Sequence, residues 1–165
     1  MKIKWVYLIF LMLSALVLAA CGPATPTAST NSSGDPAVDA SNITKVNLNT
    51  SSGDDFSAAV PGLGNRMVRE FQEYRPYISI LQFRKEIGKY VDDAEVAEYE
   101  KYVYVPIAYN DSDTATLQQI PGLDATEAAT LISGRPYASL DDFLSKLTQF
   151  VSSDQLTIAK TYLEQ

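Results

Sequence analysis

The sequence contains no histidine and only one cysteine, Cys21. Zinc sites of the Cys/His type, Cys–His nucleophiles and Ser–His–Asp triads are therefore excluded, and no disulfide can form within one molecule. Basic residues are also few: 13 Lys and Arg stand against 20 Asp and Glu, which gives a formal net charge of −7. This charge argues against nucleic-acid binding by a basic stripe, although it leaves room for contacts made by backbone amides.

Catalytic constellations are equally scarce. No pair of carboxylates stands out as a general acid and base. The acidic segment at 110–113 lacks the downstream Gly and Glu of a calcium loop, so we expect it to cap a helix. The sequence predicts a protein that is not an enzyme, with no metal site and no cofactor.

The first residues contain a secretory signal. Lys2 and Lys4 precede an apolar run over 5–20, which ends in Leu-Ala-Ala immediately before Cys21. This arrangement resembles the lipobox of bacterial lipoproteins. The resemblance implies a signal peptide over 1–20, a lipid anchor on Cys21 and an extracytoplasmic, membrane-anchored position for the rest of the chain. An uncleaved membrane anchor is the alternative, but the run is shorter than the roughly 20 residues that usually span a bilayer.

Residues 21–44 form a different kind of segment. After Cys21 they are rich in Ala, Pro, Thr, Ser and Gly, with almost no large apolar side chain. Such a composition cannot bury enough surface to offset the entropy lost on ordering. The sequence therefore predicts a flexible linker that lets the remaining chain stand off the membrane.

From Lys45 onward the chain contains an internal repeat with an offset of 60 residues. The matched segments are Val60-Pro61-Gly62-Leu63-Gly64 with Ile120-Pro121-Gly122-Leu123-Asp124, and Arg75-Pro76-Tyr77 with Arg135-Pro136-Tyr137. Apolar positions repeat at the same distance, including Phe83 with Phe143 and Ile87 with Leu147. Two copies of one structural unit are expected, over 45–107 and 108–165.

The apolar spacing within both copies is helical, so the predicted fold is all-α. Four helices are expected in each copy. In the first they are near 52–60, over 65–74, from about 79 onward and over about 93–104. In the second, a capped helix follows Asn110 and ends at 120, and the others run over 125–133, from 139 and from 152 or 153. A unit of 60 residues buries only about 60% of its unfolded surface, so the copies are expected to contact each other.

Several motifs carry a family resemblance. Asn47-Leu48-Asn49-Thr50 is followed by an apolar-Pro-Gly-apolar-Gly turn, by Arg-Pro-Tyr and, in the second copy, by a Ser-x-x-Asp helix start. Together they resemble the helix-hairpin-helix module, and more closely the ComEA-like type, the extracytoplasmic DNA receptor of natural transformation. The resemblance spans 46–163. It implies tandem helix-hairpin-helix units and non-sequence-specific binding of double-stranded DNA during competence.

In that family each unit has two hairpins, and the Gly-x-Gly turn of the first hairpin presents N–H groups to a DNA phosphate. A helix N-terminus has unpaired N–H donors and partial positive charge, and glycine lets an anion approach closely. Carried over to this chain, the DNA-binding residues implied by the resemblance are Gly62, Leu63, Gly64, Asn65, Arg66 and Arg69.

The second copy departs from this pattern. It keeps Pro121 and Gly122, but Asp124 stands where the first copy has Gly64. A carboxylate at that position repels a phosphate, so we expect the second hairpin to be structural. The family's second hairpin is also degraded in both copies, since 89–93 and 149–153 contain no Gly-x-Gly.

These departures keep an alternative open: a structural or protein-interaction module, similar to the extrinsic subunit U of photosystem II. Five tyrosines near the junction of the copies form either a partner surface or packing between the copies; they are Tyr90, Tyr99, Tyr102, Tyr104 and Tyr109. A small basic patch, Arg84, Lys85 and Lys89, either extends a phosphate-contacting face or is a solvated helix face.

Overall fold

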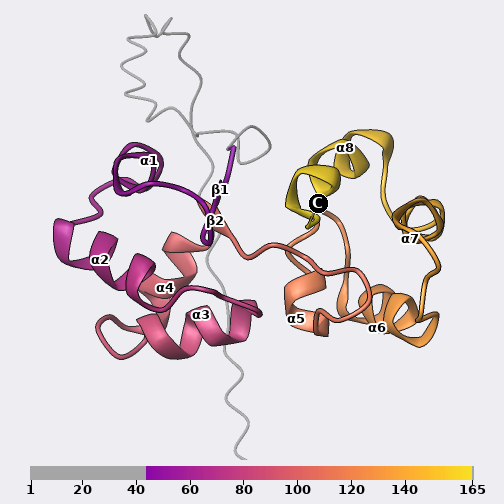
Figure 1. Cartoon of the computed structure of the whole chain (residues 1–165), viewed down its shortest axis with the longest axis horizontal. Coiled ribbons are helices and arrows are strands. Elements are labelled where there is room, and N and C mark those ends of the chain that lie inside the picture. Colours follow the sequence, from indigo (N-terminus) through magenta and orange to yellow (C-terminus); the bar gives the residue numbers. More distant parts are fainter. Residues whose placement is uncertain (1–43, 165) are drawn as a thin grey trace, which may run out of the picture. The chain divides into compact units, whose positions relative to one another are not determined.

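The computed structural model describes residues 44–164 (Figure 1). The predicted signal peptide, Cys21 and nearly all of the linker lie outside the described residues. Within them are eight helices and two short strands: β1 Val46–Asn47, α1 Gly53–Ala59, α2 Asn65–Glu73, α3 Ile80–Ile87, α4 Asp93–Tyr99, β2 Val103–Tyr104, α5 Thr114–Leu117, α6 Ala125–Ser133, α7 Leu140–Leu147 and α8 Ser153–Tyr162. The all-α expectation is confirmed. In this part of the chain no helix is both long enough and apolar enough to cross a bilayer.

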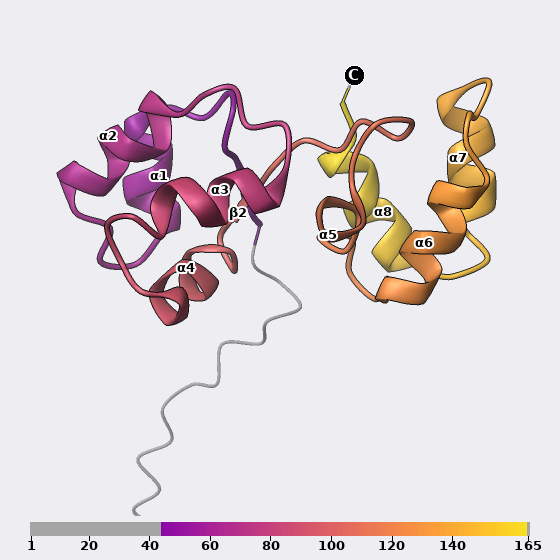
Figure 2. The same cartoon turned by 90° about the horizontal axis from the view of Figure 1, so that it is seen from below.

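Each copy of the repeat closes on itself. In the first copy β1 and β2 pair in parallel, with Val46 opposite Val103. In the second copy a parallel bridge joins Ile107 to Leu163 in the same way. The beginning and the end of each copy therefore lie side by side, with α1 to α4 between them in the first copy and α5 to α8 in the second (Figure 2).

Two predicted helices are shorter than expected. The helix over 93–104 ends at Tyr99, because Val103 and Tyr104 leave it to form β2, where the Val103 side chain is buried. The helix expected after Asn110 and up to Ile120 covers only Thr114–Leu117. The expectation that the acidic segment 110–113 caps a helix is confirmed, because Asp113 is the N-cap residue of α5. Helical spacing could not reveal that Val103 and Tyr104 pair with β1, or that Asn110 forms hydrogen bonds with Tyr137.

The Asn-x-Asn and Arg-Pro-Tyr motifs fix the loop between the second and third helices. The Asn49 side chain accepts a hydrogen bond from the Tyr77 N–H (2.8 Å) and donates one to the Tyr77 carbonyl (2.9 Å). Arg75 Nε donates to the Leu48 carbonyl. The second copy repeats these bonds with Asn110 to Tyr137 (2.9 and 3.0 Å) and Arg135 to Tyr109 (2.9 Å). Both motifs are therefore structural.

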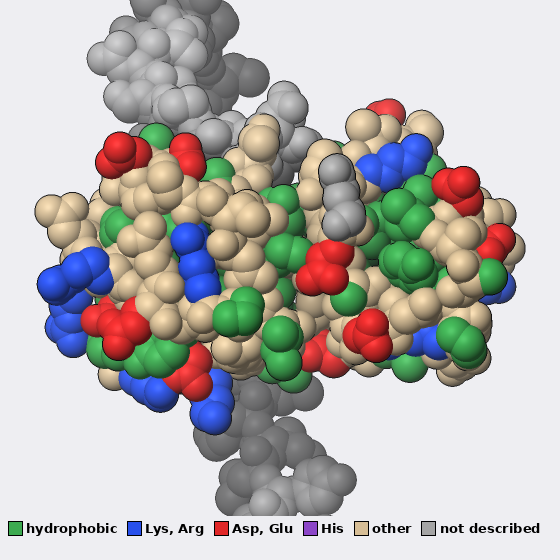
Figure 3. Space-filling view, in the orientation of Figure 1, with side chains coloured by type: hydrophobic (Ala, Val, Ile, Leu, Met, Phe, Trp, Pro, Cys, Tyr) green, Lys and Arg blue, Asp and Glu red, His purple; other side chains and the backbone are tan. Residues whose placement is uncertain are grey.

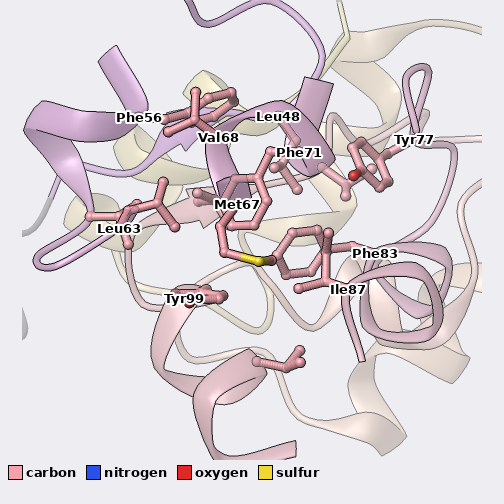
Figure 4. Close-up of a cluster of buried hydrophobic side chains, with 14 of the residues drawn as sticks. Leu48, Phe56, Leu63, Met67, Val68, Phe71, Tyr77, Phe83, Ile87 and Tyr99 are labelled. Atoms are coloured by element: carbon pink, nitrogen blue, oxygen red, sulfur yellow. The ribbon is translucent and has the colours of Figure 1, made fainter. Parts of the chain in front are cut away.

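The apolar side chains form two clusters, one in each copy. In the first, Phe71 packs edge-on against Phe56, Phe83 and Tyr99, with ring centroids 5.2 to 5.5 Å apart (Figure 4). Edge-to-face contacts of this kind add to the free energy of burial. The first cluster ends at Val105 and the second begins at Ile107, which the sequence boundary places in the first copy.

The two copies contact each other through α3 and α5. The Ile80 N–H at the start of α3 donates to Thr116 Oγ1 (3.0 Å), and the Ser79 hydroxyl donates to the Asp113 carboxylate. Burial would raise the pKa of Asp113, but the hydrogen bonds that it accepts from Ser79 and Thr116 outweigh burial and lower it. Asp113 therefore caps α5 and joins the copies as a carboxylate.

Candidate nucleic-acid interface

The first hairpin joins α1 to α2 through a tight turn. Gly62 adopts a φ of +73°, which disfavours any residue with a Cβ. Leu63 follows with its side chain only 9% exposed, packed into the first apolar cluster, and its N–H donates to the Val60 carbonyl (3.2 Å). Leu63 therefore anchors the turn, and any ligand meets its backbone and not its side chain.

Helix α2 begins without a cap. Its N-cap residue, Gly64, has no side chain to accept a hydrogen bond from the first turn, and that turn contains no acidic residue. A Cβ built at Gly64 or at Gly62 would meet no atom within 4 Å. The N–H groups of Asn65, Arg66 and Met67 therefore begin the helix at an open surface, with the partial positive charge of the helix end.

The absence of a cap distinguishes α2 from every other helix in the described part of the chain. The other seven helices each have a side chain that accepts from a backbone N–H of the first turn. The capping residues are Ser52, Ser79, Asp92, Asp113, Asp124, Ser139 and Ser152. Omitting a cap costs stability, so the open end of α2 is available for another acceptor.

Two arginines accompany this open end. Arg66 and Arg69 are exposed, and neither forms an ion pair with any residue that the structure describes. The Arg66 guanidinium lies over the Tyr90 ring, 5.2 Å from its centroid. Figure 3 shows basic side chains gathered over the N-terminal end of α2, at the left edge of the view. The contact with Tyr90 limits the conformations of Arg66 beside the helix start.

A pair of tyrosines supports Arg66. The hydroxyls of Tyr90 and Tyr74 are hydrogen-bonded (2.7 Å), and Lys89 Nζ lies 4.9 Å from the centroid of the Tyr74 ring. This hydrogen bond raises the pKa of Tyr90, which stays neutral at physiological pH. The sequence reading missed Tyr74. A comparison of the two copies could have found it, because the first copy has Tyr74 and Tyr90 where the second has Gly134 and Phe150, so the tyrosine pair occurs in the first copy alone.

The remaining basic residues of the first copy are engaged within it. Arg84 forms two hydrogen bonds with the Glu100 carboxylate (2.6 and 2.8 Å), and Lys45 donates to the Glu100 carbonyl (2.7 Å). Lys89 pairs with Glu86. Of the predicted patch of Arg84, Lys85 and Lys89, Lys85 is the most exposed residue, with 77% of its side chain accessible.

The second hairpin has the same backbone but a closed surface. Gly122 adopts a φ of +81°, and a Cβ there would lie 2.2 Å from Gln155 Nε2, so the Gln155 side chain covers the turn. Asp124 occupies the N-cap position of Gly64. Its carboxylate accepts from the Glu127 N–H (2.8 Å), and the Glu127 carboxylate accepts from the Asp124 N–H (2.9 Å). This reciprocal capping box fills the site with the chain's own carboxylates.

Of the junction tyrosines, Tyr90 and Tyr99 pack inside the first copy, whereas Tyr104 packs across the boundary between the two copies. Tyr99 is buried in the first cluster, and Tyr90 packs against it. Tyr104 stacks on Tyr162, with centroids 4.4 Å apart, and its hydroxyl donates to the Thr161 carbonyl (2.9 Å). A partner surface made of tyrosines stays a prediction.

Among the described residues no group of His, Cys, Asp or Glu has the arrangement to hold a metal ion. No protein-family model, no curated protein and no solved structure matches the chain.

Proposed function

We propose that this chain is a lipid-anchored extracytoplasmic protein whose first hairpin binds the phosphate backbone of double-stranded DNA, in the manner of ComEA-like receptors. The observation that carries the proposal is the uncapped N-terminus of α2. Backbone N–H groups at a helix start are an anion site, and contacts to phosphate position a duplex without reading its sequence. Arg66 and Arg69 supply the charge that phosphates attract.

The proposed interface is small, and this sets its expected strength. One hairpin is open and the second is closed by Asp124 and Gln155. The chain as a whole carries a net charge of −7. Binding through a few cationic contacts is weak and falls steeply as salt rises. A lipid anchor would compensate for weak affinity by concentrating the protein at a surface.

The test is a fluorescence-anisotropy titration of mixed-sequence duplex DNA with residues 21–165 carrying Cys21→Ser, which has no lipid. The variant Gly64→Asp with Arg66→Thr gives the first hairpin the residues of the second. We expect saturable binding at low salt that the double variant weakens at least tenfold, because a carboxylate then occupies the phosphate position. Loss of one cation should also lower the magnitude of the slope of log binding constant against log salt concentration by about 1.

A matched control removes the same charge elsewhere. Ser145→Asp with Lys146→Thr changes the net charge of α7 by the same amount, away from the hairpin. This control should change affinity much less than the hairpin variant. Equal losses in both variants, or unchanged binding in the hairpin variant, would contradict the proposal.

The anchor is tested independently. We expect the mature chain to begin at Cys21, with lipid on that residue, and Cys21→Ala to leave the chain without lipid. Mass spectrometry of the N-terminal peptide from membranes checks both. An unmodified Cys21 in a full-length chain would rule out the lipoprotein assignment while leaving the hairpin untouched.

A second candidate function is a structural or protein-interaction module of the subunit U type. The closed state of the second hairpin favours it, because there the glycine turn persists with no phosphate site. This candidate predicts no duplex binding at low salt and co-purification of a protein partner with the anchored chain. The titration above therefore separates the two.

A further inference from the structure

The largest departure from a polar surface lies at the start of α3. Ile78 is 77% exposed and Leu81 is 50% exposed, and they are the large apolar side chains that stand out on the described surface. The Ile78 N–H donates to Gln82 Oε1 (3.0 Å), which holds Ile78 over the first turn of α3. Leu81 and Lys85 are one helical turn apart and share a side of α3. We call Ile78, Leu81 and Lys85 the α3 face.

The α3 face differs in charge from the rest of the chain. Residues 78–89 contain three cations and one carboxylate, a net charge of +2, whereas the whole chain carries −7. The Glu86 carboxylate contacts both lysines, Lys89 closely and Lys85 at 3.9 Å, and Glu100 holds Arg84. In Figure 3 apolar side chains gather at the N-terminal end of α3 and basic ones at its opposite end.

The second copy shows that this face is not required by the fold. The counterparts of Ile78, Leu81 and Lys85 are Ala138, Asp141 and Ser145. Residues 138–149 contain one cation and two carboxylates, a net charge of −1. Since α7 keeps the same helical bounds with these residues, the apolar and basic side chains of α3 do not serve helix formation.

We propose that the α3 face contacts the surface of a bilayer containing anionic lipids. Exposed apolar side chains next to lysines match the boundary between acyl chains and charged headgroups. Duplex DNA would engage the lysine but leave Ile78 and Leu81 against water. The choice of a membrane as occupant relies on the proposed anchor: 22 residues separate Cys21 from Thr44, so the folded unit stays within about 80 Å of the bilayer.

The experiment is vesicle flotation with residues 21–165 carrying Cys21→Ser, so that no lipid anchor contributes. The vesicles contain phosphatidylcholine alone or with one-quarter phosphatidylglycerol, at low salt. We expect binding to the anionic vesicles, reduced about tenfold by Ile78→Ala with Leu81→Asp and about fivefold by Lys85→Ser. Each substitution introduces the residue that the second copy already carries at that position, so the variants are expected to fold, and circular dichroism checks this.

A matched control is Lys146→Ser on α7, which removes one charge outside the α3 face and should reduce binding less than Lys85→Ser. DNA affinity should be unchanged in the Ile78→Ala, Leu81→Asp variant, so failure of this proposal is separable from failure of the DNA proposal. Absence of vesicle binding, or binding that these substitutions leave unchanged, would overturn it. The proposal would also be overturned if the unsubstituted protein forms a dimer in solution and Ile78→Ala with Leu81→Asp dissociates it. The α3 face would then bind a second copy of the chain.

Discussion

The two hairpins share a backbone and differ in what surrounds it. Gly62 and Gly122 have nearly the same positive φ, and Leu63 and Leu123 are both buried beneath their turns. Around the first turn there is open space and an uncapped helix; around the second there is Gln155 and a capping box. The comparison shows that the glycine turn belongs to the fold, whereas the exposure of the helix start depends on the N-cap residue and on the neighbouring helix.

Substitutions at matched positions of the two copies separate what the copies share from what they do not, and the largest effects are expected in the cores. Phe83 and Phe143 are matched and fully buried. Truncation of each to alanine should cost about 3–5 kcal/mol of unfolding free energy. Denaturant unfolding followed by circular dichroism measures both. A loss confined to one of the two variants would show that the copies do not contribute equally to stability.

Alkaline pH tests one buried tyrosine in each copy. Burial raises the pKa of Tyr99 and of Tyr162 to about 12, above the ordinary value of 10.0. The folded state therefore keeps a proton that the unfolded chain loses. Stability from these groups is full below pH 10 and is lost as pH rises through 12, by on the order of 1–2 kcal/mol for each tyrosine. Urea titrations at stepped pH check this, and Tyr99→Phe or Tyr162→Phe should each remove part of the loss.

The two turn glycines should respond unequally to alanine. Gly62→Ala should cost about 1–2 kcal/mol, the penalty of a Cβ at positive φ. Gly122→Ala should cost about 1 kcal/mol more, because the new Cβ displaces Gln155, whose side chain accepts from the Ser152 N–H (2.8 Å). Thermal denaturation compares the two. In a Gln155→Ala background the difference should disappear, and a persistent difference would contradict the role of Gln155.

The smallest stability effects are expected at the N-cap positions. Gly64→Asp should raise stability by a few tenths of a kcal/mol and Asp124→Gly should lower it by a similar amount, because aspartate caps slightly better than glycine. Gly64 is not crowded, because a Cβ built there would meet no atom within 4 Å. If Gly64→Asp is strongly destabilising, its effect on DNA binding would not report on the phosphate site, and the comparison of the hairpins would fail.

Much of the fold could be predicted from the sequence. The offset of 60 residues located both copies, and apolar spacing placed α2 and α6 within one residue of their ends. The end of α4 could not be predicted, because Val103 and Tyr104 pair with β1, more than 50 residues away. Asn110 was likewise misread as part of a helix start, since its partner Tyr137 lies 27 residues downstream. Local patterns do not encode these distant pairings.

The candidate site was only partly predictable. Its residues from Gly62 to Arg69 were found through the motif, but the support that Tyr90 and Tyr74 give to Arg66 comes from separate elements. Leu63 was found as well, with a different role: its side chain fastens the turn to the core.

The sequence by itself determined that the chain repeats, that both copies are helical and that Asp124 replaces a glycine, because these are local properties of residue type and spacing. The tertiary structure alone decided that Gln155 covers the second turn, that Glu100 holds Arg84 and that Arg66 lies over Tyr90. Each of these is set by contacts between residues far apart in the chain.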